Sequence, residues 1–317
     1  MIKAFTFTCF LCSIAYTISF AQPTPEPFNT ACSTGNLYQV VSGELIEFEY
    51  GGTTTDNGEL VCPFEGVPVC ETYTDITDPN NVQSGVTRGY NALGFNPNDN
   101  LFYGMRGNNM VRIGSNCTYE DLGEPTTAAN AGCPNNYPNN GFYSATFDTN
   151  GIFYTLHNDS DVIYVIDVST NTITSCINIQ LTNGSNVPQL ADIAFDPLTG
   201  ELMGINGTTL YRIDISTGIT QSQPITGLAS GLGSTVGSIF GIVDGTIIAF
   251  YNNTGDYYQI DPATGIATFS ANTGPNGSND GGSCSDTNPF CPTTFEVLPE
   301  VVCNNDDTYT VTITTNI

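Results

Sequence analysis

Few side chains in this sequence belong to the kinds on which enzymes most often rely. Among its 317 residues, Lys3 is the only lysine and His157 is the only histidine. A metal site built from several histidines is therefore excluded, and a Schiff-base lysine would have to be Lys3, in the first few residues. At most one histidine-based catalytic site could be built.

His157 could act as a general base only beside a suitable partner. The nearest candidates in sequence are Asp159 and Ser160. Neighbours in one turn rarely reach the geometry of a catalytic pair, and no G-x-S-x-G nucleophile motif occurs. We therefore expect His157 to be a surface-loop histidine at the end of a strand. Serine hydrolase chemistry is disfavoured.

A calcium ion is the one cofactor that the sequence leaves possible. The stretch Asp148-Thr-Asn-Gly151 partly matches an acidic calcium loop, although Thr146 stands where that pattern favours a carboxylate. Asp148 and Asn150 are therefore the candidate metal ligands. The alternative is that this loop is only a turn, and we expect no other cofactor.

Several tyrosines could bind a glycan by stacking, because a tyrosine presents an apolar face and a hydroxyl. We favour the alternative that these side chains pack between strands. The tyrosines concerned are Tyr103, Tyr143, Tyr154, Tyr251, Tyr257 and Tyr258.

The charge of the chain limits its partners. It contains 31 acidic and 5 basic residues, a formal net charge of −26. Nucleic acids and anionic membrane surfaces attract basic patches, so neither is expected as a partner. An unknown protein or a glycan remains.

The first residues predict an exported protein. Met1-Ile-Lys3 is a short positive region, an apolar run follows to Phe20, and Ala21 offers a small-residue cleavage site. We therefore expect a signal peptide over residues 1–21 and a secreted or cell-surface protein. A transmembrane helix is the alternative for this segment, and no other segment is a candidate to span a membrane.

Export makes disulfides the expected state of the cysteines. Nine cysteines remain after residue 21, an odd number, so one stays free or pairs outside the chain. The short spacings suggest Cys62 with Cys70, Cys284 with Cys291, and Cys117 with Cys133. Spacing alone leaves the connectivity open.

The elements that would carry these residues repeat along the chain. Residues 91–123, 144–179, 191–225 and 237–271 each contain four short β-rich pieces separated by turns. Four strands per repeat of 45 to 52 residues predict the blades of a β-propeller. A β-sandwich is the main alternative.

The turns within these repeats share a mechanism. Asp167–Asn171, Asp214–Gly218 and Asp261–Gly265 are variants of one hairpin turn. The aspartate can accept hydrogen bonds from N–H groups just ahead of it, and Gly or Asn tolerates the left-handed position. We expect these aspartates to build turns rather than to bind calcium.

The first blade lacks an obvious first strand. Residues 36–41 and 44–50 suit its second and third strands, residues 72–76 its fourth, and residues 51–69 an insertion. Residues 279–285 could supply the missing strand and close the ring. We expect five blades over residues 32–285, with six as the alternative.

The remaining C-terminal residues predict a different unit. We expect a linker over residues 286–302 and the first strand of a truncated β module over residues 303–317, because that segment alternates apolar and polar residues. The expectation is that further modules of the same polypeptide follow; a ragged C-terminus is the alternative.

Several motifs resemble an uncharacterised family of secreted β-propellers. They are Tyr90-Asn-Ala-Leu-Gly-Phe-Asn-Pro97, Val111-Arg-Ile-Gly-Ser115, Thr118-Tyr-Glu-Asp-Leu-Gly123 and Asn279-Asp-Gly281. This resemblance implies a propeller within large bacterial surface proteins, which often carry gliding-motility or type IX secretion modules. It implies no reaction and no catalytic residues.

The function expected from these observations is a non-enzymatic module for interaction, adhesion or display. The alternative is a calcium-dependent propeller hydrolase resembling lactonases. A hydrolase would need Asp and Asn side chains that converge at one end of the central channel.

Overall fold

The structure is a computed structural model. It describes residues 24–28, 37–41, 44–50, 53–54, 60–61, 64–70, 72–75, 82–84, 90–134, 141–157, 161–283, 297–303 and 309–315. The predicted signal peptide lies outside these residues. In the part of the chain so described, no helix is long and apolar enough to cross a bilayer.

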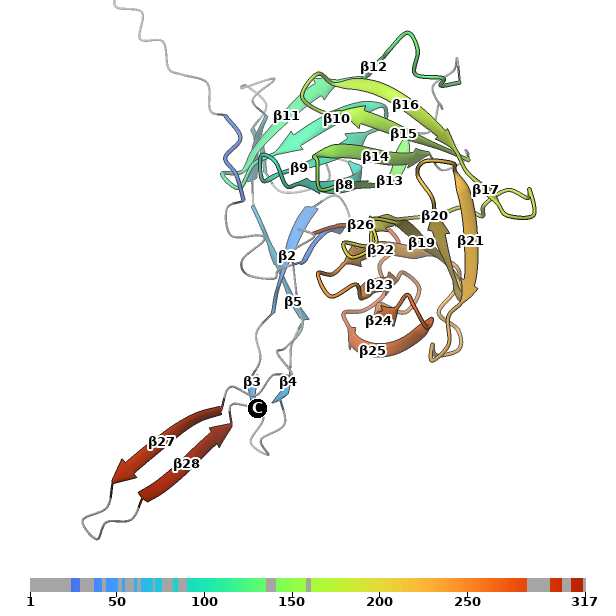
Figure 1. Ribbon diagram of the computed structural model, residues 1–317. Coiled ribbons are helices and arrows are strands. Elements are labelled where there is room, and N and C mark those ends of the chain that lie inside the picture. Colours follow the sequence, from blue (N-terminus) through green and yellow to red (C-terminus); the bar gives the residue numbers. More distant parts are fainter. Residues whose placement is uncertain are drawn as a thin grey trace, which may run out of the picture.

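Five sheets arranged in a ring form a β-propeller, as the repeats predict (Figure 1). From the axis outward, blade 1 consists of β26 (Asn279–Gly282), β1 (Leu37–Val41), β2 (Glu44–Tyr50) and β5 (Phe64–Pro68). Blade 2 consists of β8 (Asn91–Asn96), β9 (Leu101–Arg106), β10 (Asn109–Ile113) and β11 (Thr118–Gly123).

The other blades follow the same order. Blade 3 consists of β13 (Phe142–Phe147), β14 (Ile152–His157), β15 (Val162–Asp167) and β16 (Thr172–Asn178). Blade 4 consists of β18 (Ile193–Phe195), β19 (Leu202–Asn206), β20 (Thr209–Ile213) and β21 (Ile219–Pro224). Blade 5 consists of β22 (Val236–Gly241), β23 (Ile247–Tyr251), β24 (Asp256–Asp261) and β25 (Ile266–Asn272).

The ring closes as predicted, because a C-terminal strand completes the first blade. β26 pairs antiparallel with β1, and Val41 lies opposite Asn279 in that register. The closure joins the two ends of the propeller in one sheet, so that β1 is paired on both sides. Gly281 is required here, because a Cβ at this position would lie 2.8 Å from the Phe240 ring of blade 5.

The prediction for the outer strand of blade 1 was wrong. The fourth strand is β5, from the stretch expected to be an insertion, and it pairs with β2. The predicted strand at residues 72–76 instead forms β6 (Thr72–Asp75), which pairs in parallel with β11 of blade 2. The two similar segments are therefore neighbours in one blade rather than equivalent strands of two blades.

Linkers between blades cover the outer edges of the sheets. The segment leaving one blade pairs in parallel with the outermost strand of the next: β6 with β11, β12 (Thr126–Thr127) with β16, and β17 (Gln180–Leu181) with β21. At blade 5 this pairing shrinks to one bridge, between Thr226 and Ile266. A short strand β7 (Val82–Ser84) extends the sheet of blade 2 beyond β6.

Two disulfides fix such linkers and are consistent with an extracellular protein. Cys70 bonds to Cys117, and Cys133 bonds to Cys176. The pairings suggested by short spacing, Cys62 with Cys70 and Cys117 with Cys133, are therefore wrong. Each bond ties a linker to the next blade, so its partner lies one repeat away. Cys284 and Cys291 lie outside the described residues.

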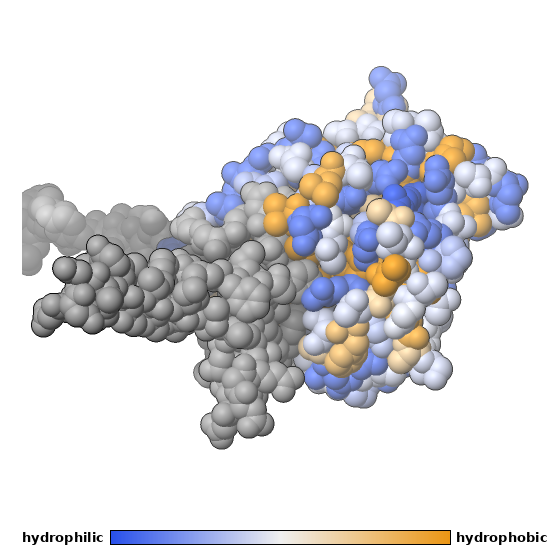
Figure 2. All heavy atoms as spheres, turned by 60° about the horizontal axis from the view of Figure 1, so that its bottom comes forward, coloured by the Kyte–Doolittle hydropathy of each residue, from blue (hydrophilic) through white to orange (hydrophobic). Residues whose placement is uncertain are grey.

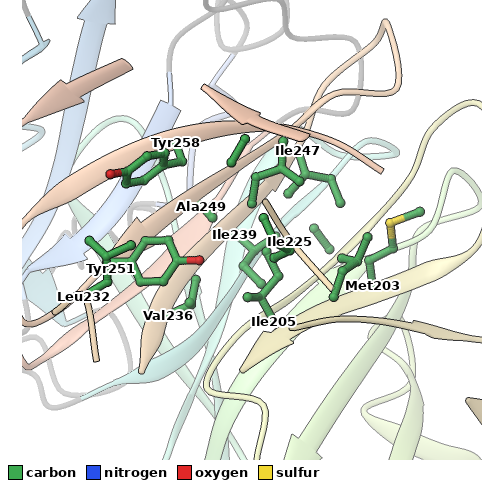
Figure 3. Close-up of a cluster of buried hydrophobic side chains, with 14 residues drawn as sticks. Met203, Ile205, Ile225, Leu232, Val236, Ile239, Ile247, Ala249, Tyr251 and Tyr258 are labelled. Carbon is green, nitrogen blue, oxygen red and sulfur yellow. The ribbon is translucent and has the colours of Figure 1, made fainter. Parts of the chain in front are cut away.

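The core of the described residues lies between neighbouring blades, in five clusters of buried side chains. Figure 3 shows the cluster between blades 4 and 5, where Met203 and Ile205 meet Val236, Ile239 and Ile247. β22 and β23 are buried at every position, so both faces of this blade pack against a neighbour, because successive side chains of a strand point to opposite faces. On the face seen in Figure 2, hydrophobic residues lie in small separate groups among hydrophilic ones.

The C-terminal residues form a hairpin outside the ring. β27 (Val297–Cys303) pairs antiparallel with β28 (Tyr309–Thr315) along seven residue pairs. Most of the second half of the expected linker is therefore a strand, and it supplies the partner that a lone strand at residues 303–317 would lack. A second small hairpin joins β3 (Thr53–Thr54) to β4 (Leu60–Val61).

Candidate functional site

Two aspartates meet at the propeller axis. Asp192 directly precedes β18, the inner strand of blade 4, and Asp280 lies in β26, the inner strand of blade 1. Both side chains are 0 % exposed. Blades 1 and 4 are not neighbours in the ring, so contact between these two residues crosses its centre.

Asp192 accepts hydrogen bonds from main-chain N–H groups of three inner strands. Its Oδ1 accepts from Ile193 of its own blade at 2.7 Å, and its Oδ2 accepts from Ile239 of blade 5 at 2.6 Å. The same Oδ2 accepts from Gly281 of blade 1 at 3.3 Å. Both carboxyl oxygens of Asp192 are therefore occupied by donors.

Asp280 extends this arrangement to blade 2. Its Oδ2 accepts a hydrogen bond from the main-chain N–H of Leu93, and the Asp280 carboxyl is also hydrogen-bonded to that of Asp192. A bulge in β8 directs the Leu93 N–H, because Ala92 adopts the left-handed conformation at φ 54°. A buried alanine rarely adopts this conformation. The pair therefore links inner strands of four of the five blades.

Burial changes the acidity of both carboxyls. Loss of solvation raises the pKa of Asp192 well above its usual value, although hydrogen bonds from Ile239, Ile193 and Gly281 oppose the rise. Loss of solvation also raises the pKa of Asp280, and the nearby charge of Asp192 raises it further. Of the two carboxyls, Asp280 is therefore the one that is more readily protonated.

A buried amide network lies beside the pair and joins blade 1 to blade 5. The Gln39 amide donates to the Ser238 hydroxyl at 2.7 Å and to Asn279 Oδ1 at 3.2 Å. The Tyr257 hydroxyl donates to Gln39 Oε1 at 2.7 Å, and Asn279 Nδ2 donates to Asn252 Oδ1 at 2.8 Å. These contacts fasten the closing strand β26 to its neighbours.

The mouth of the axis above the pair is narrow. It holds a cavity of about 30 Å³ between the inner strands, lined among others by Phe95, Thr146, Asp148 and Phe195. Such a volume has room for about two water molecules. A substrate could not reach the two aspartates through it without movement of the inner strands.

A larger recess lies between blades 2 and 3, away from the axis. It measures about 710 Å³ and is lined mainly by amides, hydroxyls and carboxylates: Asn96, Asn98, Asp99, Tyr103, Arg112, Asn150, Asp167, Ser169, Thr170 and Asn171. Few apolar side chains line it, namely Leu122, Ile152 and Val168. Its size falls within the roughly 300–1,000 Å³ of ordinary ligand sites.

Hydrogen bonds fix several side chains that line this recess. The Tyr103 hydroxyl donates to Asp99 Oδ2 at 2.7 Å, and Asn98 Nδ2 donates to the main-chain carbonyl of Asn150 at 2.6 Å. Arg112 forms a salt bridge with Glu120. The recess therefore has a preformed polar lining.

Of the two predicted metal ligands, Asn150 lines this recess, whereas Asp148 lines the cavity at the axis. Asp148 Oδ1 accepts from the main-chain N–H groups of Asn150 and Ile152, both at 2.9 Å, and its Oδ2 accepts from Asn150 Nδ2 at 3.3 Å. In the described part of the chain, no group of three or more His, Cys, Asp or Glu side chains could hold a metal ion. Calcium also uses carbonyl and amide oxygens, so its assignment to Asp148 and Asn150 stays a prediction.

His157 is placed differently from the expectation. It does end a strand, β14, but it is only 2 % exposed, and its ring packs edge-on against Phe142 with centroids 6.1 Å apart. The prediction of a surface-loop histidine was therefore wrong, because β14 carries its side chain into the interior. Asp159 and Ser160 lie outside the described residues.

The tyrosines mostly pack between strands, which was the favoured alternative. Each of five has an exposed fraction of 7 % or less: Tyr103, Tyr154, Tyr251, Tyr257 and Tyr258. Tyr143 is half-buried beside His157. None of the five buried rings offers a face for stacking.

Sequence reasoning did not single out Asp192 and Asp280 as a pair. The signal that could have found them is the alignment of the first strands. Where blades 1 and 4 have aspartate, the strands of blades 2, 3 and 5 have Ala92, Ser144 and Ser238. An aspartate at a position where the other repeats have a small residue predicts a contact that those repeats do not make.

Most of the propeller matches a known family. Residues 71–286 match the family described as a repeat of unknown function (DUF6923). The chain belongs to this family. The DUF6923 match begins just before β6 and ends just after β26, so it contains both axis aspartates. Among curated proteins, none matches this DUF6923 chain.

Solved structures similar to the DUF6923 chain include a protein of unknown function from Bacteroides caccae, at 12 % identity and TM-score 0.40 over 75 % of this chain and 73 % of that one. A streptogramin B lyase has 12 % identity and TM-score 0.41 over 88 % and 87 %. The virginiamycin B lyase from Staphylococcus aureus has 13 % identity and TM-score 0.39 over 74 % and 73 %. At this level of similarity they carry no argument about activity.

Proposed function

We propose that this chain is a secreted or cell-surface, non-enzymatic β-propeller that binds a glycan in the recess between blades 2 and 3. It would serve as an interaction, adhesion or display module of a larger modular polypeptide. The single observation that carries the proposal is the recess itself, a ligand-sized space whose lining combines amides, hydroxyls and carboxylates with apolar surface.

The chemistry of the lining favours a glycan over a protein. Amides and carboxylates offer the paired donors and acceptors that sugar hydroxyls need. The core of a protein interface is instead enriched in aromatic and apolar anchors, and the recess has only Leu122, Ile152 and Val168 of that kind. The buried tyrosines rule out stacking on their faces, so binding would rest on hydrogen bonds.

The axis supports a non-enzymatic role. A hydrolase of the alternative type needs free Asp and Asn oxygens at one end of the channel. Asp192 and Asp280 do converge there, but main-chain N–H groups occupy both oxygens of Asp192 and one oxygen of Asp280. N–H groups aimed at a site repel a cation, so this arrangement does not suit calcium.

Two serines in equivalent turns provide a matched test of the recess. Ser169 lines the recess, and Ser216 occupies the same turn position in blade 4 outside it. Each hydroxyl donates to the aspartate two residues earlier, at 2.6 and 2.7 Å. Ser169→Trp would fill the recess, whereas Ser216→Trp loses the same turn contact without filling it.

The experiment is a glycan array followed by titration of the best glycan. We expect Ser169→Trp to weaken binding at least about tenfold, because a filled pocket loses most of its contacts, while Ser216→Trp keeps it. Silence across the array would contradict the glycan proposal. Binding that is equal in both variants would place the glycan elsewhere on the propeller.

Calcium titration tests the alternative at Asp148 and Asn150. A higher melting temperature in millimolar calcium that disappears in Asp148→Asn would favour a metal site in that loop. An unchanged melting temperature would contradict a metal site in that loop.

The setting among gliding-motility or type IX secretion modules is tested by the gene sequence beyond residue 317, where a sorting domain would support surface display.

A further inference from the structure

The axis carboxyls contact each other, and no salt bridge formed by the described residues involves either of them. Both are fully buried, and the salt bridges formed by described residues, Arg112 with Glu120 and Arg212 with Glu201, involve the third strands β10 and β20 rather than the axis. Two buried negative charges in contact would repel strongly in a medium of low polarity. The arrangement therefore requires something other than an opposite charge to hold it together.

Within the described ranges, the elements around the pair contain no other ionisable group that supplies this charge. The inner strands β8, β18 and β22 contain no ionisable side chain. On adjoining strands, the Tyr38 hydroxyl donates to Glu47 at 2.6 Å, and Tyr143 packs its ring against His157 with centroids 6.5 Å apart. These groups have partners of their own.

A proton can hold the two carboxyls together. An ionised carboxylate only accepts hydrogen bonds, so a hydrogen bond between two carboxyls requires that one of them is protonated. We propose that Asp192 and Asp280 share a single proton and form a pH-dependent lock that closes the propeller ring. This inference goes beyond the proposed function and does not depend on it.

The donors decide which oxygen carries the proton. Both oxygens of Asp192 accept main-chain N–H groups, so this residue is the carboxylate. Asp280 Oδ2 accepts from Leu93, whereas Oδ1 accepts no N–H group and is buried. We therefore place the shared proton on Asp280, whose Oδ1 is the one carboxyl oxygen of the pair that no N–H group occupies.

Loss of that proton would act on β26, the strand that closes the ring. β26 is a short strand from the C-terminal side of the propeller, and its sheet partner is β1 alone. Ionising Asp280 would set two buried negative charges against each other between β26 and β18. The closing strand would then detach more easily at high pH, which exposes the inner edge of blade 1.

An asparagine scan of the pair tests the lock. In Asp280→Asn, the new amide can donate permanently to Asp192 while its carbonyl accepts from Leu93, so the lock no longer titrates. In Asp192→Asn, the amide group must face an N–H donor, because both original oxygens accept one. Asp244→Asn, in an exposed loop, is the control for removing one negative charge.

The melting temperature is measured from pH 5 to pH 10 for all four proteins. We expect the wild type and Asp244→Asn to lose roughly 5 °C or more as the pH rises, and Asp280→Asn to stay nearly constant. Asp192→Asn should melt well below wild type at every pH. Equal pH dependence in wild type and Asp280→Asn would overturn the proposal.

Infrared spectroscopy of the wild type gives a readout that does not depend on variants folding. A protonated carboxylic acid has a carbonyl band distinct from that of a carboxylate. We expect one such band at pH 7, which weakens as the melting temperature falls and is missing in Asp280→Asn. A wild type with no protonated carboxyl at pH 7 would also overturn the proposal.

Discussion

Aspartates at the axis and aspartates at the rim accept the same kind of hydrogen bond, but their pKa values shift in opposite directions. At the rim, Asp214 accepts from the main-chain N–H of Ser216 at 2.9 Å, much as Asp192 does from Ile193. Hydrogen bonds, led by that from the Ser216 hydroxyl, lower the pKa of Asp214 to about 2. At the axis, burial raises the pKa of Asp192 and Asp280 despite their donors.

The difference shows that solvent access decides whether the pKa of an aspartate is raised or lowered. Water still solvates the rim carboxylates, so each N–H or hydroxyl donor adds to an already favourable charged form. At the axis, loss of water outweighs the donors. The rim aspartates confirm the predicted turn mechanism, and Asp261 repeats it, with Thr264 and Ala263 as donors at 2.7 and 2.8 Å.

The two sites therefore change stability with pH in opposite directions. A folded pKa raised above the usual value near 3.8 gives stability that is complete below about pH 4 and is lost as pH rises through the folded pKa. A lowered pKa gives stability present above about pH 4 and lost as pH falls toward 2, as at Asp214. Rising pH should therefore weaken the axis, and strong acid the rim.

The largest effect should follow from Asp192→Ala. This substitution leaves the N–H groups of Ile193, Ile239 and Gly281 buried and without their acceptor. We expect the free energy of unfolding to fall by about 3–5 kcal/mol, measured by denaturant titration. Asp244→Ala serves as the exposed control. A loss as small as the control's would show that the axis contacts do not stabilise the ring.

The second effect concerns the rim linker between blades 2 and 3. Cys133→Ala with Cys176→Ala removes a disulfide that spans 43 residues of sequence. We expect a loss of about 2–4 kcal/mol, because the unfolded chain regains freedom. Mass analysis before unfolding should find this bond in the wild type. A change under about 1 kcal/mol would mean that strand pairing alone holds the linker.

The third effect concerns the amide network that fastens β26. Gln39→Ala removes the acceptor of the Tyr257 hydroxyl and one of the partners of Ser238, which still donates to Asn279. We expect a loss of about 1–3 kcal/mol, measured by the same denaturant titration. Since the Gln39 amide does not titrate, the loss should be equal at pH 5 and pH 9. A loss that grows with pH would show coupling to the axis carboxyls.

The architecture was predictable because it repeats. Strand alternation, turn aspartates and a period of 45 to 52 residues fix a blade plan, and Asn279-Asp-Gly281 had no place except in the incomplete first blade. These patterns are local, or they relate equivalent positions of the repeats. They are therefore enough to predict the five blades and the strand that closes the ring.

The rest depends on which segments lie side by side across blades. Cys70 and Cys133 bond to cysteines in the next blade, and β6 pairs with β11, whereas sequence spacing considers only near neighbours. The contact of Asp192 with Asp280 likewise joins positions from non-adjacent blades. His157 was misjudged because its neighbours in sequence are polar, although β14 turns its side chain inward.

The smallest effect should come from Asp214→Ala at the exposed rim. The aspartate accepts from Ser216 and Thr217, but water can replace it as the acceptor for both donors. We expect the melting temperature at pH 7 to fall by no more than about 2 °C, because exposed groups far from the core rarely do more. The variant should also lose less stability than wild type between pH 4 and pH 2, where the lowered pKa of Asp214 acts. A scan of melting temperature against pH checks both points. If Asp214→Ala instead changed how the melting temperature falls at high pH, the distinction would be wrong. That distinction is that acid weakens the rim and rising pH weakens the axis.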